Sequence, residues 1–398
     1  MEIGVIGKPN VGKSTLFNAF TLLDVPMAPY PFTTLEPHHG TGAIRVPCPH
    51  HEKGTACTPG NAKCVDGTRW VPVNLVDVPG LVPGASEGKG LGRKFLDDLR
   101  ASDGFIQVVD AAGATTAEGV SAEPGTVDPS EEVTWLEDEL VDWVAGILGR
   151  DFERNARSVE LEGKKVEEFL HDRLAGLSLS PAAISAGLRG SPVDRDHPSS
   201  WSTADRRNLA QSLLRAAKPR FVAANKADRA SPEAVHALGE KVAPIPVGPT
   251  CAEAELTLRR AARAGLVQYK PGDATFAESD PGRLTVGQRK ALEEVRTIVR
   301  RWGGTGVQPV LERMVFDRLG QMVVFPVEDE QRWTDGQGRV LPDALLVPLH
   351  TPARAVAYRV HTDLGENFIR AIDGRTQRAL GAEHPLEPGT VVRIVSRR

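Results

Sequence analysis

The sequence has few cysteines, few aromatic residues and no strong excess of charge of either sign. Four cysteines in 398 residues exclude a small disulfide-stapled scaffold. The formal net charge is −4, so no chain-wide basic field attracts nucleic acid and any such contact must be local. No apolar run reaches about 18 residues, and the N-terminus enters a strand-like run without a leader pattern. We therefore expect a soluble, cytoplasmic protein with no membrane partner and no DNA partner.

The length suits two or three domains, each with its own core. Short apolar runs alternate with helical patterns in the first part of the chain, which indicates an α/β domain with a mainly parallel sheet. The expected strands are Ile3–Ile6, Ala43–Val46, Val71–Val76, Phe105–Val109, Phe221–Ala224 and Ile245–Val247. In such a sheet, ligand loops lie beyond the carboxyl ends of the strands.

The next stretch is rich in Glu, Arg, Leu and Ala and predicts helices over Ser130–Gly149, Asp151–Leu177 and Ser202–Lys218, with a turn region over Pro181–Ser200. Ser130 is a candidate N-cap. Further helices are expected at Ala254–Ala264, Val286–Trp302 and Gln308–Leu319. From Met322, short strands and Gly/Pro turns surround one helix near Thr351–Tyr358, which fits a small α+β domain. We expect an α/β domain over 1–128 and 218–275, a helical insertion over 129–217, a helical connector over 276–321 and a C-terminal domain over 322–398.

Residues Gly7 to Ser14 match the phosphate-binding loop pattern, with two glycines around four residues and then Lys-Ser. The glycines let backbone N–H groups close around a polyphosphate. Lys13 would reach the β- and γ-phosphates, and the Ser14 hydroxyl would ligate Mg²⁺. The residues expected to contact a nucleotide here are Lys8, Pro9, Asn10, Val11, Gly12, Lys13, Ser14 and Thr15.

Two further segments fit a γ-phosphate and its magnesium ion. Asp77 ends a strand and is followed by Val-Pro-Gly, so its carboxylate can hold Mg²⁺ through water while the Gly80 N–H meets the γ-phosphate. Thr33 and Thr34 lie between the phosphate loop and Asp77, and a threonine hydroxyl there could complete the Mg²⁺ shell and order the segment. The two adjacent threonines leave that assignment open.

The tetrapeptide Asn225-Lys226-Ala227-Asp228 also ends a strand. The Asp228 carboxylate can accept two N–H donors from the edge of guanine, Asn225 can meet the purine N7, and Lys226 can lay its stem along the base. Adenine would leave Asp228 charged and unpaired, which allows discrimination of about 10⁴-fold. After the next strand, a backbone N–H of Cys251-Ala252 could reach the guanine oxygen. Cys251 itself is expected to pack rather than to react.

With these motifs the chain resembles translation-factor-related GTPases of the Obg family, in the YchF-related branch and in particular its archaeal-type members. The resemblance covers nearly the whole chain and lies in Lys8–Thr15, Tyr30–Thr34, Asp77–Ala85, Glu87–Gly92 and Val360–Gly365. It implies a P-loop GTPase domain, a helical insertion, and a C-terminal TGS domain of ubiquitin-like β-grasp fold. It also implies association with ribosomes or RNA, and Thr34 rather than Thr33 as the magnesium ligand.

Two positions qualify what the resemblance implies. Many YchF relatives lack the guanine-reading aspartate and are similar to ATPases, whereas this chain has Asp228, so we do not expect a preference for ATP. Leu81 stands where many GTPases place a water-orienting glutamine, so intrinsic hydrolysis should be slow unless a partner completes the site. In similar GTPases an asparagine at the Asn10 position helps to hold K⁺ over the phosphates; alternatively, Asn10 only shapes the loop.

Three cysteines and two histidines fall between Cys48 and Cys64, a density that suggests zinc. The candidate ligands are Cys48, His50, Cys57 and Cys64. Their spacing is irregular, and the alternative is a loop in which Cys57 and Cys64 only pack.

The segment Leu345–Arg398 has eight arginines and no lysine against five acidic residues, a formal charge of +3 in a chain that is negative overall. This balance is typical of an RNA-facing surface, and the alternative is that the arginines are merely scattered over the surface. We expect a GTP-binding protein that hydrolyses GTP to GDP and phosphate as a switch, through Lys13, Thr34, Gly80 and Asn10. The alternatives are a nucleotide-binding scaffold with negligible hydrolysis and a small-molecule phosphotransferase, which would need an acceptor pocket with a general base.

Overall fold

The computed structural model describes residues 1–21, 38–78, 100–177 and 179–397. The chain divides into two compact units. Within the described residues, unit 1 holds 1–19, 38–40, 74–78, 100–177 and 179–310, and unit 2 holds 20–21, 41–73 and 311–397. None of the described helices is long and apolar enough to cross a membrane.

A parallel sheet forms the centre of unit 1, as the alternating pattern predicts. The strands are β1 (Glu2–Ile6), β4 (Thr68–Asp77), β5 (Gly104–Asp110), β6 (Arg220–Asn225) and β7 (Val247–Pro249), and they pair in parallel in the order β4-β1-β5-β6-β7. Next to β4 lies β2 (His38–Pro47), and β3 (Lys63–Val65) pairs with β4 in the antiparallel sense. Strands β5 and β6 are buried along their whole length, as expected of parallel strands covered on both faces. The predicted α/β fold is confirmed.

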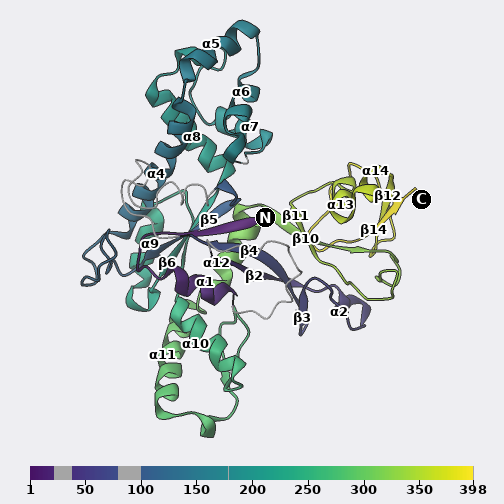
Figure 1. The fold of residues 1–398 in the computed structure, drawn as a ribbon. Helices are drawn as coiled ribbons and strands as arrows, with labels where there is room; N and C mark the ends of the chain where they lie inside the picture. Colours follow the sequence, from purple (N-terminus) through teal and green to yellow (C-terminus); the bar gives the residue numbers. More distant parts are fainter. Residues whose placement is uncertain (22–37, 79–99, 178, 398) are drawn as a thin grey trace. The chain divides into compact units, whose positions relative to one another are not determined.

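Helices surround this sheet and extend from it (Figure 1). They are α1 (Lys13–Thr21), α4 (Pro129–Gly149), α5 (Phe152–Glu162), α6 (Val166–Arg173), α7 (Pro181–Arg189), α8 (Thr203–Ala217), α9 (Pro232–Lys241), α10 (Ala252–Arg263), α11 (Val286–Trp302) and α12 (Val307–Arg313). A two-stranded ribbon, β8 (Val267–Gln268) and β9 (Ala277–Glu278), connects α10 to α11. Short 3₁₀ turns cover Ala175–Leu177, Pro198–Ser200, Ala227–Arg229 and Pro281–Arg283, and a π-helical turn covers Met314–Arg318.

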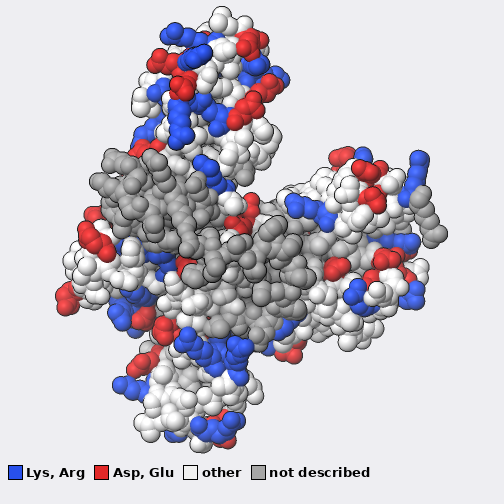
Figure 2. All heavy atoms as spheres, in the orientation of Figure 1, with Lys and Arg blue, Asp and Glu red and all other residues white. Residues whose placement is uncertain are grey.

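The helices α5 to α8 gather in one group with their own apolar core, in which the rings of Phe152 and Trp201 stack with centroids 5.5 Å apart. Acidic and basic side chains intermingle over this group in Figure 2, which fits the solvated, charge-alternating face predicted from the sequence.

Three local predictions for this region were wrong. The single helix expected over Asp151–Leu177 is interrupted, because Gly163 ends α5 in the left-handed conformation. The turn region expected over Pro181–Ser200 contains α7, whose N-cap Ser180 accepts a hydrogen bond from the Ala183 N–H. The N-cap of α4 is Asp128 rather than Ser130, because Pro129 occupies the first helical position and Asp128 accepts from the Ser130 N–H.

Two predictions further along the chain were also wrong in their limits. The helix expected over Gln308–Leu319 is α12 followed by the π-helical turn. The strand expected at Ile245–Val247 lies two residues later, in β7.

Unit 2 contains a five-stranded mixed sheet that carries the C-terminal fold. Its strands are β10 (Gln321–Val327), β11 (Leu345–Pro348), β12 (Phe368–Asp373), β13 (Ala379–Leu380) and β14 (Val391–Ser396), in the order β11-β10-β14-β12-β13. Only β10 and β14 pair in parallel. Helix α13 (Ala353–Val360) buries Val356 against this sheet, and the short α14 (Thr362–Glu366) follows it. His361 caps α14 by accepting a hydrogen bond from the Asp363 N–H. The arrangement confirms the predicted C-terminal β-grasp domain.

Candidate nucleotide-binding site

The loop from Gly7 to Gly12 joins the end of β1 to the start of α1, and its two glycines are required by their surroundings. Gly7 has φ +146°, and a Cβ there would lie 2.4 Å from the Val108 carbonyl oxygen. Gly12 has φ +96°, and a Cβ there would lie 2.3 Å from the Asn225 side-chain nitrogen. Side chains at either position would push the loop away from the ends of β5 and β6. The loop therefore passes close to these strand ends, and at its two glycines no side chain keeps a phosphate away from the backbone N–H groups.

Lys13 and Ser14 begin α1 directly after this loop. The Lys13 ammonium is buried and donates to the Lys8 carbonyl oxygen at 3.0 Å, so it spans the loop. Burial lowers the pKa of Lys13, and the charges of Asp77 and Glu132 oppose that shift. The Ser14 hydroxyl donates to the Asp77 carboxylate at 2.9 Å, although the two residues come from different elements. A hydroxyl and a carboxylate at this distance form an oxygen donor set of the kind that Mg²⁺ prefers.

Asn225, the last residue of β6, ties the phosphate loop to the segment that follows β7. Its amide nitrogen donates to the Val11 carbonyl oxygen at 2.9 Å. Its amide oxygen accepts from the Ala252 N–H at 3.2 Å and from the Thr250 hydroxyl at 3.3 Å. One buried side chain thus joins three segments that are far apart in the sequence, and the predicted guanine motif lies beside the predicted phosphate loop.

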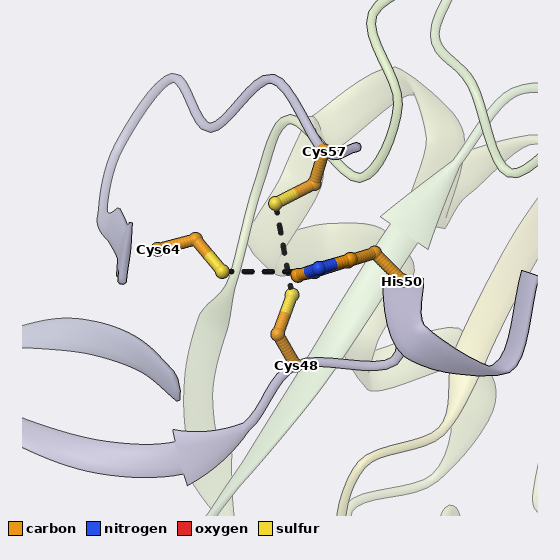
Figure 3. A group of neighbouring side chains, drawn as sticks. All are labelled: Cys48, His50, Cys57 and Cys64. Atoms are coloured by element: carbon orange, nitrogen blue, oxygen red, sulfur yellow. Dashed lines mark hydrogen bonds between the residues drawn. The ribbon is translucent and has the colours of Figure 1, made fainter. Parts of the chain in front are cut away.

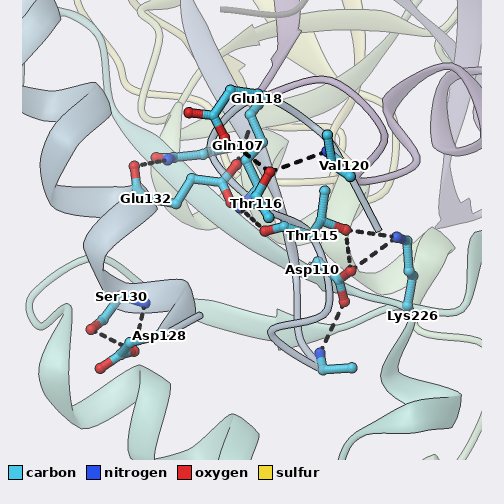
Figure 4. Close-up of polar contacts among 12 residues, drawn as sticks. Gln107, Asp110, Thr115, Thr116, Glu118, Val120, Asp128, Ser130, Glu132 and Lys226 are labelled. Atoms are coloured by element: carbon cyan, nitrogen blue, oxygen red, sulfur yellow. Dashed lines mark hydrogen bonds and ion pairs between the residues drawn. The ribbon is translucent and has the colours of Figure 1, made fainter. Parts of the chain in front are cut away.

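Lys226 and Asp228 leave this strand end in different directions. Lys226 has φ 58°, and its ammonium contacts the Asp110 carboxylate at 2.9 Å and the Thr115 hydroxyl at 3.2 Å (Figure 4). Asp110 is almost fully buried and also accepts from the Ala112 N–H, so it fixes the stem of Lys226. Asp228 lies in the 3₁₀ turn with its side chain exposed, 3.6 Å from the Arg229 guanidinium. The carboxylate is therefore accessible to a ligand.

Helix α11 and the segment after it support this turn. Trp302 donates its indole N–H to the Ala227 carbonyl oxygen at 3.2 Å, and the Cys251 N–H donates to the Thr305 carbonyl oxygen at 2.8 Å. Cys251 is 3% exposed, and burial followed by the nearby Asp228 charge raises the pKa of its thiol to about 12. The thiol is thus a packing group, as predicted.

A buried carboxylate network underlies the same region and was not found from the sequence. Glu255 of α10 is fully buried and accepts from Arg259 at 2.5 Å, from the Tyr269 hydroxyl at 2.6 Å and from the Thr305 hydroxyl. Burial and the Glu255 charge raise the pKa of Tyr269 above its ordinary value. A Glu-Arg pair four residues apart is the only local signal of this network, and such pairs are usually exposed on a helix surface.

Lys8 of the phosphate loop makes a second contact that the sequence did not reveal. Its ammonium lies 3.0 Å from the Glu132 carboxylate of α4 and donates to the Thr115 carbonyl oxygen at 2.7 Å. Both side chains are buried, and burial raises the pKa of Glu132 while the charge of Lys8 opposes that shift. The pair holds the outer side of the phosphate loop to the first turn of α4.

The segment after β5 also packs on the phosphate loop. The Asn10 amide nitrogen donates to the Gly119 carbonyl oxygen at 2.6 Å, and Asn10 itself has φ 64°. At Gly119 a Cβ would lie 2.8 Å from the Pro9 side chain. Asn10 therefore shapes the loop in this structure through its nitrogen, and its amide oxygen is the atom a K⁺ ion would need.

Some predicted site residues cannot be placed in this way. Thr34 and Gly80 lie outside the described residues, as do Thr33 and Leu81. Thr15 follows Ser14 within α1. The four candidate zinc ligands lie together in unit 2, where one ligand atom of each lies within 4.8 Å of the others.

Three family models match the chain. A model described as 50S ribosome-binding GTPase matches residues 2–148, and one described as Obg-like GTPase YGR210-like, G4 motif-containing domain matches residues 223–329. A TGS domain model matches residues 338–396.

Some known proteins resemble the chain over nearly its whole length, and others over about a third of it. An uncharacterized GTP-binding protein of Methanocaldococcus jannaschii is 44% identical over 396 residues, which is 99% of this chain and 98% of that protein. The crystal structure of a GTP-binding protein from Pyrococcus horikoshii OT3 is 36% identical with a TM-score of 0.80 and full coverage of both chains. The ribosome-binding ATPase YchF of Haemophilus ducreyi is 39% identical over 141 residues, which is 35% of this chain and 36% of that protein.

Proposed function

Because the chain belongs to the Obg-like, YchF-related family of GTP-binding proteins, we propose that it binds GTP with Mg²⁺ and hydrolyses the nucleotide to GDP and phosphate as a molecular switch. The observation that carries the proposal is the hydrogen bond from Asn225 to the Val11 carbonyl oxygen. It joins the segment suited to guanine to the loop suited to its phosphates, so one nucleotide can reach both.

The base preference follows from Asp228. A carboxylate accepts two N–H donors from guanine, and adenine offers no such pair. The relatives named ribosome-binding ATPase YchF align over 141 to 143 residues, about a third of the chain. The matched family model that covers residues 223–329, by contrast, is described by its G4 motif. We therefore expect GTP to be preferred over ATP here.

The residues proposed for hydrolysis mainly position charge. Lys13 would contact the transferred phosphoryl group, and Ser14 and Asp77 would hold Mg²⁺, with Thr34 and Gly80 closing on the γ-phosphate. Phosphoryl transfer of this kind rests on positioning and electrostatic stabilisation. Because Leu81 offers no group to orient the attacking water, intrinsic turnover should be slow. A positive charge from a partner, or a K⁺ ion near Asn10, that acts like an arginine finger should raise the turnover rate by roughly 10³- to 10⁵-fold.

Single-turnover hydrolysis separates this proposal from its rivals. Purified protein in molar excess over γ-labelled GTP is followed with and without ribosomes, and Lys13→Ala serves as the inactive control. A switch releases phosphate, and does so faster with its partner. A scaffold binds GTP and releases no phosphate under either condition. A phosphotransferase also releases no free phosphate, but when an acceptor molecule is added the labelled γ-phosphate moves onto that acceptor and GDP is formed.

The TGS domain is the proposed contact to the ribosome or to RNA. It matches the family model, and exposed arginines on it make no ion pair with any described residue; they are Arg359, Arg370, Arg378 and Arg397. Arginines that can reach phosphates give affinity without sequence reading, and few aromatic side chains are available to stack on bases. A protein with such a partner works in the cytoplasm.

Ribosome co-sedimentation tests this surface. Replacing Arg359 and Arg370 with glutamate should weaken ribosome binding. The slope of the logarithm of the binding constant against the logarithm of salt concentration should become shallower by about one for each arginine replaced. The matched control reverses the exposed Arg154 and Arg195 of the helical group, which changes the net charge equally. Equal binding by the two double variants would contradict a TGS contact.

A further inference from the structure

Four potential metal ligands converge in unit 2, close to the end of β2. Cys48 follows that strand, His50 begins α2 (His50–Lys53), Cys57 lies in the next loop and Cys64 lies in β3. Figure 3 shows the three sulfur atoms and the imidazole directed toward one another. One ligand atom from each residue lies within 4.8 Å of all the others.

Two distances within the cluster match those of a tetrahedral metal centre. The Cys48 and Cys57 sulfur atoms are 3.9 Å apart, and the Cys64 sulfur is 3.6 Å from His50 Nδ1. With metal–sulfur bonds of about 2.3 Å and a metal–nitrogen bond of about 2.0–2.1 Å, tetrahedral angles place two sulfurs about 3.8 Å apart and a sulfur and a nitrogen about 3.6 Å apart. A disulfide needs a sulfur–sulfur distance of about 2.05 Å, and all of the cysteines are free. The spacing thus fits an ion at the centre of the group.

A buried arginine beside the cluster gives an independent argument. Arg69 of β4 is 0% exposed and donates to the Cys48 sulfur at 3.5 Å and to the Leu341 carbonyl oxygen at 2.8 Å. Its Nε and Nη1 atoms have no hydrogen-bond partner, and no carboxylate pairs with it, within the residues that the structure describes. An ionised group buried without a counter-charge is costly. Among the described residues, the Cys48 sulfur is the side-chain atom that accepts a hydrogen bond from this guanidinium, so a thiolate of the cluster can supply the counter-charge.

We propose that Cys48, His50, Cys57 and Cys64 bind one structural Zn²⁺ ion. Binding converts three thiols to thiolates and releases three protons to solvent, while the imidazole remains neutral. The resulting centre has a net charge of −1, which balances the buried Arg69. Soft sulfur ligands in tetrahedral geometry select zinc among the common divalent ions. Four protein ligands close the coordination sphere, so the ion serves structure rather than catalysis.

The zinc centre fixes the 48–64 segment on the C-terminal domain within unit 2. The Thr58 and Gly60 N–H groups donate to the carbonyl oxygens of Val340 and Pro342 at 2.8 and 2.7 Å. Asn61 exchanges two hydrogen bonds of 3.0 Å with the Ala344 backbone. This segment contains only the single-turn helix α2 and the three-residue β3, so the metal supplies much of the order on which these contacts depend.

Metal analysis of the full-length protein tests the proposal with matched controls. The protein is purified under reducing conditions, refilled with excess Zn²⁺, desalted and measured by mass spectrometry of the elements. Two pairs of variants isolate the site. His50→Ala removes a ligand, whereas His51→Ala removes the neighbouring imidazole, whose ring stacks on it at 4.4 Å. Cys57→Ser removes a ligand, whereas Cys251→Ser removes a buried cysteine of unit 1.

We expect about one zinc per chain in the wild type, His51→Ala and Cys251→Ser, and weakened or lost zinc in His50→Ala and Cys57→Ser. Arg69→Met should weaken zinc binding about 10- to 100-fold, the usual effect of removing a partner of a metal ligand. Should a ligand variant fail to fold, cobalt in the wild type gives the answer through the intense absorption of thiolate-bound, tetrahedral Co²⁺. No zinc in the refilled wild type, or full zinc in Cys57→Ser, overturns the proposal, as does a cobalt spectrum without thiolate bands.

Discussion

Replacing Glu255 by glutamine should destabilise the support of the turn that we propose to bind guanine. Glu255 is fully buried and is the common acceptor for Arg259, Tyr269 and Thr305. Gln keeps the shape but removes the charge that balances Arg259, which is 7% exposed. Breaking a buried ion pair on one side costs about 3–5 kcal/mol, because the remaining charge is left without compensation.

This loss of stability should appear as a decrease in the melting temperature, Tm. At about 2–4 °C per kcal/mol for a domain of this size class, Glu255→Gln should lower the Tm by about 10 °C. Binding of GTP should also weaken, since Thr305 accepts the Cys251 N–H beside the proposed base site. Calorimetric unfolding and nucleotide titration measure the two effects.

The matched control is Glu240→Gln on α9, where the carboxylate is exposed and lies 3.8 Å from His236. An exposed pair contributes about 0–1 kcal/mol, so its Tm should hardly change. The double variant Glu255→Gln with Arg259→Met should be no less stable than Glu255→Gln alone, because the uncompensated charge is gone. Equal melting temperatures for Glu255→Gln and Glu240→Gln would refute the reasoning.

Two further predictions concern the edges of the site. At neutral pH, Asp128→Ala should lower stability by about 1 kcal/mol through loss of the α4 cap, and Asp128→Asn should lower it less because Asn also caps a helix. Hydrogen bonding from Lys241 and Ser130 lowers the pKa of Asp128 from 3.8 to about 2. The stability advantage of Asp over Asn is therefore present above about pH 4 and is lost as the pH falls toward about 2. Denaturant unfolding of both proteins across this range measures it, and a stability difference that does not change with pH would contradict the claim. GTP turnover should rise when K⁺ replaces Na⁺ and lose that response in Asn10→Ala, and equal steady-state rates in the two salts would rule out a potassium role.

The sequence pointed to those parts of the proposed site in which chemistry restricts the residue type. A phosphate loop needs glycines and a Lys-Ser pair at fixed spacing, and guanine needs a carboxylate, so Gly7–Ser14 and Asn225–Asp228 were recognisable in the sequence alone. The strands that carry them are continuous apolar runs, which is why the sheet was predicted correctly. The structure brings both motifs together as the parallel sheet requires.

The parts that were missed depend on contacts between distant residues. Lys8 and Glu132 are 124 positions apart, and Glu132 has the appearance of an ordinary acidic residue in the first turn of a helix. Arg69 is one of many arginines, and only its burial beside Cys48 distinguishes it. The interruption at Gly163 depends on one left-handed residue in an otherwise helical composition. Composition and spacing carry no information on which buried charges meet.

The most direct test of the central claim measures nucleotide binding to wild type and Asp228→Asn by titration calorimetry with GTP, ATP and xanthosine triphosphate. An amide at position 228 offers one acceptor and one donor, which match the N–H and carbonyl of xanthine but not the two donors of guanine. Two hydrogen bonds to a charged acceptor are worth about 1.5–3 kcal/mol each, so the variant should bind GTP roughly 10²- to 10⁴-fold more weakly. We predict that the wild type binds GTP more tightly than ATP, and that Asp228→Asn binds xanthosine triphosphate more tightly than GTP. Equal GTP affinity in the two proteins, or a wild type that prefers ATP, would contradict the account.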